Sequence, residues 1–172
     1  QSFRIRAVVV DGDVAATDGA CHWPRLECDT LNAFAATPKS PADFEIRVAD
    51  ADRGRPVRVI EALDGQLVTG AMRLPVPVRH GRLSADPASD ILMIAVVDRY
   101  DDRPPAVAFI RNVGLKRGAI ASSVSHDSHN IVAVGVDEAS LARAVNLVIE
   151  SRGGLSVTGP DGDAVLPLPI AG

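Results

Sequence analysis

Two apolar segments that enclose a polar run constrain this fold more than any other stretch of the chain. The apolar segments are residues 118–121 and 131–136, and the polar run between them, residues 122–130, holds two of the four histidines, an aspartate and an asparagine. Burying such groups without hydrogen-bond partners costs on the order of 1 to 3 kcal/mol each. We therefore expect two core strands joined by a loop that either reaches solvent or has its polar groups satisfied within the fold. Such a loop is a candidate functional site.

The composition indicates a sheet-rich core and narrows the choice of partner. Hydrophobic residues make up 47% of the 172 residues but aromatic residues only 3%, so the core has to be built from Val, Ile, Leu and Ala, which suit buried strands. So few aromatic residues provide no stacking platform for single-stranded nucleic acid. The formal net charge is −4, with acidic and basic residues interspersed, so there is no basic stripe for phosphate backbones or an anionic membrane. The expected partner is a small molecule or a protein.

Turn signals divide the chain into an N-terminal hairpin, a connector and a larger domain. Residues 5–10 form a β-branched run that ends at Asp11-Gly12, and residues 14–16 return across this turn. Periodicity is lost over residues 20–41, a stretch with three prolines, both cysteines and the single Trp, which is typical of a connector. We therefore expect a first unit over residues 1–19, a connector over 20–41 and a domain over 42–172.

The larger domain is predicted to contain many short strands. Turn residues such as Asp64-Gly65 and His80-Gly81 separate these strand candidates, which are residues 44–48, 57–62, 66–69, 72–78, 91–97 and 106–113, together with the two strands within 118–136. Residues 155–157 and 165–168 are predicted to close a final hairpin over residues 160–163.

One helix is predicted, over residues 138–150. Its apolar residues recur at helical spacing, and these are Leu141, Val145, Val148 and Ile149. Asp137 is a suitable N-cap and Gly153-Gly154 a suitable C-terminal stop. Because strands outnumber helices and tight turns join several of them, the predicted fold class is α+β, with a mixed, mainly antiparallel sheet.

The sequence also bears on location and on the cysteines. No apolar run approaches the roughly 20 residues of a membrane span, and residues 1–6 have no signal-peptide character. We therefore expect a cytoplasmic protein. In that compartment Cys21 and Cys28 are expected to be free thiols rather than a disulfide.

The polar run admits several kinds of chemistry. A catalytic triad made of the consecutive residues Ser125, His126 and Asp127 is disfavoured, because neighbours on an extended backbone point to opposite faces. Metal ligation by His126, Asp127 and His129 gives at most an open site, and no zinc spacing is present. General acid–base catalysis or substrate hydrogen bonding by these three residues is a further interpretation. The alternative without function is a turn whose side chains bond their own backbone.

The residues around the polar run resemble a known family. Residues 114–131 are similar to the C-terminal domain of bacterial adenine deaminases, which belong to the amidohydrolase superfamily. The resemblance covers roughly residues 32–172 in the same order, and its other segments are 43–46, 57–60, 65–69, 85–87 with 90–92, 144–146 and 166–172. Residues 5–19 resemble the last strands of the small β-sandwich that flanks the catalytic barrel of amidohydrolases.

The resemblance implies a metal-dependent hydrolase of purine metabolism that converts adenine to hypoxanthine and ammonia. In that family a (β/α)8 barrel holds a divalent metal, manganese or iron, which makes a hydroxide available near neutral pH. The four histidines of this chain, at positions 22, 80, 126 and 129, include no His-x-His pair of the kind that opens this metal site. We therefore expect the barrel to be absent from this chain and to hold the metal elsewhere, with no metal ligand here. On this interpretation the chain is the C-terminal piece of a longer polypeptide, and both of its ends are artificial or processed. We expect the chain to be inactive by itself.

On this hypothesis the loop over residues 122–130 closes the active site beside the barrel. The catalytic candidates are His126, Asp127 and His129, and the substrate-binding candidates are Ser123, Ser125 and Asn130. The expected partners are the remainder of the same enzyme, a purine substrate and further copies in a homo-oligomer, but neither nucleic acid nor a membrane. Two alternatives remain at this point: a stand-alone module that binds a small ligand or regulates without catalysis, and an amidohydrolase that acts on another purine or amide.

Overall fold

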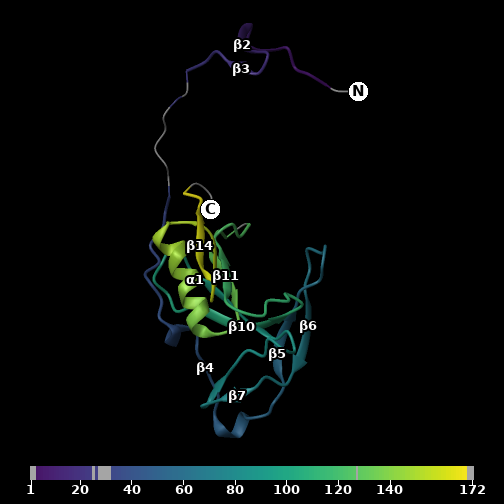
Figure 1. Cartoon of the computed structure of the whole chain (residues 1–172), viewed down its shortest axis with the longest axis vertical. Coiled ribbons are helices and arrows are strands. Elements are labelled where there is room, and N and C mark those ends of the chain that lie inside the picture. The colour runs from purple at the N-terminus through teal and green to yellow at the C-terminus, as the bar shows by residue number, and fades with distance from the viewer. Residues whose placement is uncertain (1–2, 25, 27–31, 127, 170–172) are drawn as a thin grey trace. The chain divides into compact units, whose positions relative to one another are not determined.

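The computed structural model describes residues 3–24, 26, 32–126 and 128–169 (Figure 1). Residues 1–30 and residues 31–172 form two separate units. The division falls within the segment predicted as a connector, while the assignment of the three segments to domains stays a prediction. None of the described helices is long and apolar enough to cross a membrane.

The first unit is a small antiparallel sheet. Its strands, in the order β1-β2-β3, are β1 (Ala7–Val10), β2 (Asp13–Thr17) and β3 (Ala20–Cys21). Asp11 and Gly12 connect β1 and β2 with φ angles of 52° and 93°, the left-handed backbone that a tight hairpin turn requires. The predicted hairpin is therefore confirmed. Cys21 is an exposed free thiol, whereas Cys28 lies outside the described residues.

The second unit is built on an eight-stranded sheet in the order β14-β13-β11-β12-β9-β10-β5-β6. Its strands are β5 (Val57–Glu61), β6 (Gly70–Leu74), β9 (Leu92–Val97), β10 (Ala106–Arg111), β11 (Ala119–Ser122), β12 (Ile131–Gly135), β13 (Gly154–Gly159) and β14 (Gly162–Pro167). All neighbouring pairs are antiparallel except β10 and β5, which are parallel. The sheet is thus mixed and mainly antiparallel, as predicted.

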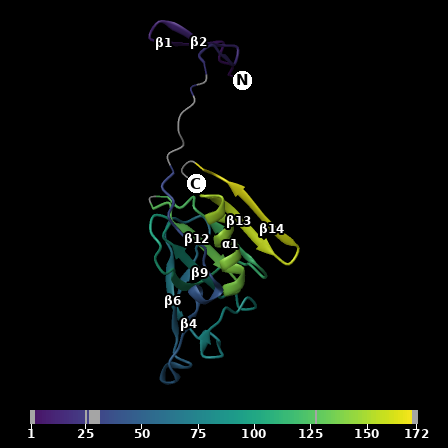
Figure 2. The same cartoon turned by 90° about the vertical axis from the view of Figure 1, so that its left-hand side faces the viewer.

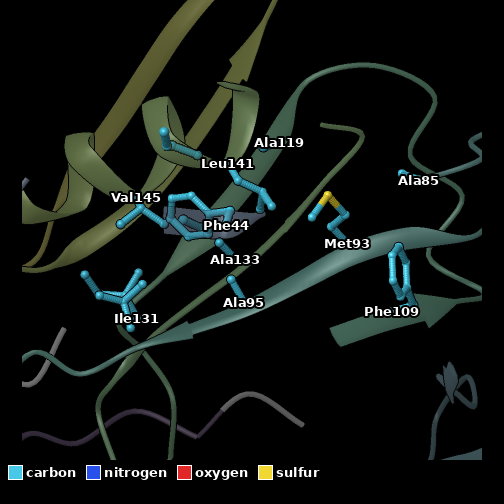
Figure 3. Packing of buried hydrophobic residues seen from close by; sticks show 14 of the residues in the cluster. Phe44, Ala85, Met93, Ala95, Phe109, Ala119, Ile131, Ala133, Leu141 and Val145 are labelled. Atoms are coloured by element: carbon cyan, nitrogen blue, oxygen red, sulfur yellow. The ribbon is translucent and has the colours of Figure 1, made fainter. Parts of the chain in front are cut away.

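The helix α1 (Glu138–Glu150) packs on one face of this sheet (Figures 1 and 2). It begins where expected, because the backbone N–H of Ser140 donates to Oδ1 of Asp137 at 2.6 Å. Beneath it, Phe44 lies fully buried against Leu141, Val145 and Ala133 (Figure 3). One helix on one face of a mainly antiparallel sheet is an α+β fold, so the predicted fold class is confirmed.

Short elements fill the rest of the second unit. They are the 3₁₀-helices η1 (Pro41–Phe44) and η2 (Asp50–Asp52), and a small sheet in the order β4-β8-β7 made of β4 (Ile46–Arg47), β8 (Arg82–Leu83) and β7 (Val78–Arg79). His80 and Gly81 form the turn between β7 and β8 with φ angles of 51° and 75°, which confirms the predicted turn, and the side chain of His80 is exposed.

Three strand predictions were wrong in part or in full. Residues 66–69 form no strand, and Leu67 is fully exposed; this short apolar stretch follows the Asp64-Gly65 turn and has no strand to pair with. Residues 41–44 form η1, which leaves only β4 of the predicted strand 44–48. The predicted strand 72–78 is divided between β6 and β7, since Pro75 and Pro77 lack the N–H groups that a continuous strand needs.

Candidate functional site

The loop over residues 122–130 connects β11 to β12, two inner strands of the main sheet. The predicted position of the loop between two core strands is therefore confirmed. Its first residues are fixed to β13. The backbone N–H of Ser123 donates to the carbonyl of Gly154 at 2.9 Å, and the backbone N–H of Gly154 donates to the hydroxyl oxygen of Ser123 at 2.8 Å. Ser123 is fully buried, so its hydroxyl serves the strand pairing in this structure. Its predicted role in substrate binding stays a prediction.

The middle of the loop is a turn held by its own backbone and hydroxyl groups. The backbone N–H of His129 donates to the carbonyl of Ser125 at 2.7 Å, and the hydroxyls of Ser125 and Ser128 lie 3.4 Å apart. His129 has a φ of 52°, a left-handed conformation that is uncommon for residues other than glycine. The two interpretations of the polar run, a self-bonded turn and a functional site, therefore concern the same residues.

The histidines of this turn differ in exposure. The side chain of His126 is exposed and that of His129 is half-buried. Within the described part of the chain, Nδ1 of His129 is buried and has no hydrogen-bond partner. Such a buried nitrogen is a costly feature unless another group approaches it. Asp127, the third catalytic candidate, lies outside the described residues.

Arg99, which follows the end of β9, forms hydrogen bonds to the loop. It is 4% exposed, and its guanidinium donates to the backbone carbonyl of His129 at 3.4 Å and to Oδ1 of Asn32 at 2.7 Å. Its backbone N–H donates to Oδ1 of Asn130 at 3.3 Å. The guanidinium also lies 4.9 Å from the ring centre of Phe34 and 5.5 Å from that of Tyr100, distances at which a cation is attracted to an aromatic face.

Neither Arg99 nor Asn32 was recognised from the sequence as part of the site. Asn32 also donates through Nδ2 to the carbonyls of Arg152 and Pro169, at 2.6 Å and 3.0 Å. It therefore joins three segments that are far apart in the sequence. The available signal was an arginine two positions after the apolar run 91–97, and this is an ordinary pattern at a strand end. Only the fold brings Asn32, Arg99 and His129 together.

Three aspartates elsewhere in the second unit have lowered pKa values. The hydrogen bond from Lys39 and a second one from Thr37 lower the pKa of the Asp102 carboxyl. The hydrogen bond from Arg143 lowers the pKa of Asp163, and the backbone and hydroxyl of Ser40 lower that of Asp43. These hydrogen bonds fix surface segments of the second unit to one another.

The second unit is thus an α+β domain with a histidine-bearing loop between two core strands. A family model described as the adenine deaminase C-terminal domain matches residues 66–172. The chain belongs to this family. The family resemblance predicted from the sequence is therefore confirmed.

Curated relatives that match the chain carry the name adenine deaminase. The protein from Salinibacter ruber is 46% identical over 172 residues, which cover 99% of this chain and 31% of the relative. The proteins from Methanosarcina barkeri and Methanothermobacter thermautotrophicus are 39% and 46% identical, and each match covers 100% of this chain and 32% of the relative. The chain therefore spans about a third of the length of the relatives it matches.

Proposed function

We propose that the polypeptide to which this chain belongs is a hydrolase that converts adenine and water to hypoxanthine and ammonia. In this proposal the chain contributes a C-terminal domain, and its loop over residues 122–130 closes the active site. The observation that carries the proposal is the match along the whole chain to proteins named adenine deaminase. The stand-alone ligand-binding or regulatory module is not favoured, because these relatives match the chain from end to end.

The structure supports a different proposed role for each of several residues in the loop. His126 is exposed on the loop, where we propose that it contacts a bound purine, and imidazole is suited to moving protons near neutral pH. The buried Nδ1 of His129, with no partner in the described residues, is available to a donor or acceptor brought in by substrate or by the rest of the polypeptide. Ser125 and Asn130 flank these groups as hydrogen-bonding candidates. Asp127 keeps its proposed catalytic role on the sequence alone.

A divalent metal, manganese or iron, is implied by the family resemblance, and the described residues do not fit such a site. Nowhere in the described ranges do three or more His, Cys, Asp or Glu side chains gather so that they can hold a metal ion. We therefore derive no step of the reaction through a metal in this chain. We propose that a part of the polypeptide outside this chain holds it, and that the chain alone is inactive. A cytoplasmic location accords with the exposed free thiol of Cys21.

The test compares three histidine variants of the full-length polypeptide. His126→Asn and His129→Asn remove the imidazoles of the loop, and His80→Asn removes an exposed imidazole from the turn between β7 and β8. Asparagine tolerates the left-handed backbone of His80 and His129, so the variants should fold alike. Adenine turnover is followed by ammonia release with manganese or iron supplied. We expect kcat to fall by about 10² to 10⁴ for His126→Asn, the usual range for losing a general acid or base, and to stay unchanged for His80→Asn.

Two results would count against the proposal in different ways. If the metal-loaded wild-type polypeptide releases no ammonia from adenine, the proposed reaction is wrong. If the wild type is active and both loop variants match His80→Asn in kcat and KM, the loop has no part in the reaction and serves the fold.

A further inference from the structure

The face of the main sheet opposite α1 is only partly covered within the described residues of the second unit. Leu92, Ile110 and Val134 on this face belong to a second buried cluster, whereas the part that extends over β13 and β14 is exposed. Along each of the strands β9, β11, β12 and β13, successive side chains point alternately to the α1 side of the sheet and to the opposite side. Residues 93, 95, 97, 119, 121, 131 and 133 belong to the buried core under α1. Their neighbours in sequence therefore point away from the helix. We call the following six residues of this side the open face: Val96, Ile120, Val132, Leu155, Val157 and Leu166.

Strand register confirms that these side chains share one face. Val132 is paired with Val96, Ile120 with Val157, and Leu155 with Leu166, and cross-strand partners point to the same side of an antiparallel sheet. Figure 2 shows the β13–β14 hairpin beside α1, with the helix on only one side of it. The open face thus extends over adjacent strands as one continuous surface.

Most of the open face is exposed to solvent, and none of its six side chains is charged. Val96, Ile120, Leu155, Val157 and Leu166 are 38% to 59% exposed, and the strands β9, β11, β12 and β13 contain no Asp, Glu, Lys or Arg. At the other end of the sheet, by contrast, two charged and exposed residues lie opposite each other in the strand register, Arg58 on β5 and Arg73 on β6. Solvent-facing sheets normally alternate apolar and polar residues, and contiguous apolar patches mark interaction surfaces.

We infer that the open face is the docking surface for the remainder of the same polypeptide. The chain spans 31% to 32% of the relatives it matches, so about two thirds of each relative's length has no counterpart here. The open face also runs into the loop over residues 122–130: Ser122 is paired with Val132 and Leu155, and Val124 within the loop is 53% exposed. A body that covers the loop therefore reaches the open face as well.

An uncharged apolar surface suits a permanent contact within one polypeptide better than a transient one, because transient interfaces keep more polar and charged residues. The inference rests on that part of the proposed function which places the chain in a longer polypeptide. It does not depend on adenine being the substrate, and its test involves no turnover.

The test measures cysteine reactivity in the full-length polypeptide, in which all native cysteines, Cys21 and Cys28 included, are replaced by serine. Val157→Cys reports on the open face, and Ala139→Cys reports on the exposed outer side of α1. We expect a maleimide to label Val157→Cys at least about tenfold more slowly than Ala139→Cys, because labelling at a covered site requires local opening. Equal labelling rates would overturn the inference.

A second measurement on the unaltered sequence identifies what covers the face. The full-length polypeptide is produced with photo-leucine, half of it isotopically labelled, and the two halves are unfolded, mixed and refolded before irradiation. Cross-links from Leu155 and Leu166 to segments outside residues 1–172 of the same isotopic copy are expected. Cross-links that join differently labelled copies would mean that a second copy covers the face, and an absence of cross-links beyond residues 1–172 would mean that no part of the polypeptide outside this chain covers it. Either result overturns the inference, whatever the activity on adenine.

Discussion

At the scale of single residues, Arg99 shows how a buried charge supports a functional loop. A guanidinium at 4% exposure is costly unless its donors and its flat faces find partners. Here Asn32 and the carbonyl of His129 accept its hydrogen bonds, and the rings of Phe34 and Tyr100 lie within 4.9 Å and 5.5 Å. The conformation of the histidine turn is therefore tied to a residue that stands thirty positions earlier in the chain.

Replacing Arg99 should destabilise the domain far more than replacing an exposed arginine. Arg99→Met keeps the length of the side chain but leaves Asn32 and the His129 carbonyl without their donor. We expect the free energy of unfolding, measured by urea titration of the 172-residue chain, to fall by about 2 to 4 kcal/mol. Arg58→Met, on the exposed side of β5, should change it by less than about 0.5 kcal/mol. Similar losses in the two variants would show that Arg99 does not fix the loop.

At the scale of elements, the stem of the loop depends on the contact between Ser123 and Gly154. Gly154 begins β13 with a φ of 146°, a backbone conformation that other residues rarely adopt. A Cβ at this position would overlap the carbonyl of Leu166 on β14. The backbone of Gly154 thus pairs with β14 on one side. On the other side its N–H donates to the Ser123 hydroxyl and its carbonyl accepts from the Ser123 N–H.

Gly154→Ala should therefore cost much more stability than an alanine at a glycine with open space. Left-handed strain and the overlap with Leu166 together predict a loss of at least about 3 kcal/mol in the free energy of unfolding. Gly65→Ala is the matched control, since Gly65 also has a positive φ, of 67°, but has no atom near its Cβ position; its cost should be about 1 kcal/mol. Urea unfolding of both variants checks the difference. Equal costs would mean that the β13–β14 pairing yields to the added methyl group.

Local patterns in the sequence predicted the elements well where one segment alone determines them. The helix over residues 138–150 was found at its observed bounds because its spacing, N-cap and terminal glycines agree. Residues 66–69 misled the prediction, since apolar character does not supply a partner strand. Likewise, the polar run identified the loop, but nothing local shows that Ser123 pairs with Gly154 or that Arg99 lies under His129. Those contacts depend on strand order, which no short segment of sequence contains.

At the scale of the whole second unit, the segment before η1 is fastened to both the helix and the sheet. The backbone N–H of Lys39 donates to Oδ1 of Asn146 on α1 at 2.8 Å, and Nδ2 of Asn146 donates to the carbonyl of Lys39 at 2.9 Å. The Lys39 side chain is only 7% exposed, and its Nζ lies 2.5 Å from Oδ1 of Asp102. A buried ammonium depends on such a partner, so the charge state of Asp102 affects how the segment is held.

The stability of the unit should therefore depend on pH through Asp102. The hydrogen bond from Lys39 lowers the pKa of Asp102 in the folded state below its ordinary value of 3.8. A lowered folded-state pKa means that the stabilising contribution is fully present above pH 3.8 and is lost as the pH falls through the folded value. Asp102→Asn should consequently be less stable than wild type at neutral pH, and this difference should shrink on acidification below about pH 4. Urea unfolding of both chains across this range measures it, with Asp64→Asn in the exposed turn after β5 as the control. A difference between Asp102→Asn and wild type that stays constant down to the lowest pH would contradict the assignment, because a carboxylate that matters must lose its effect once it is protonated.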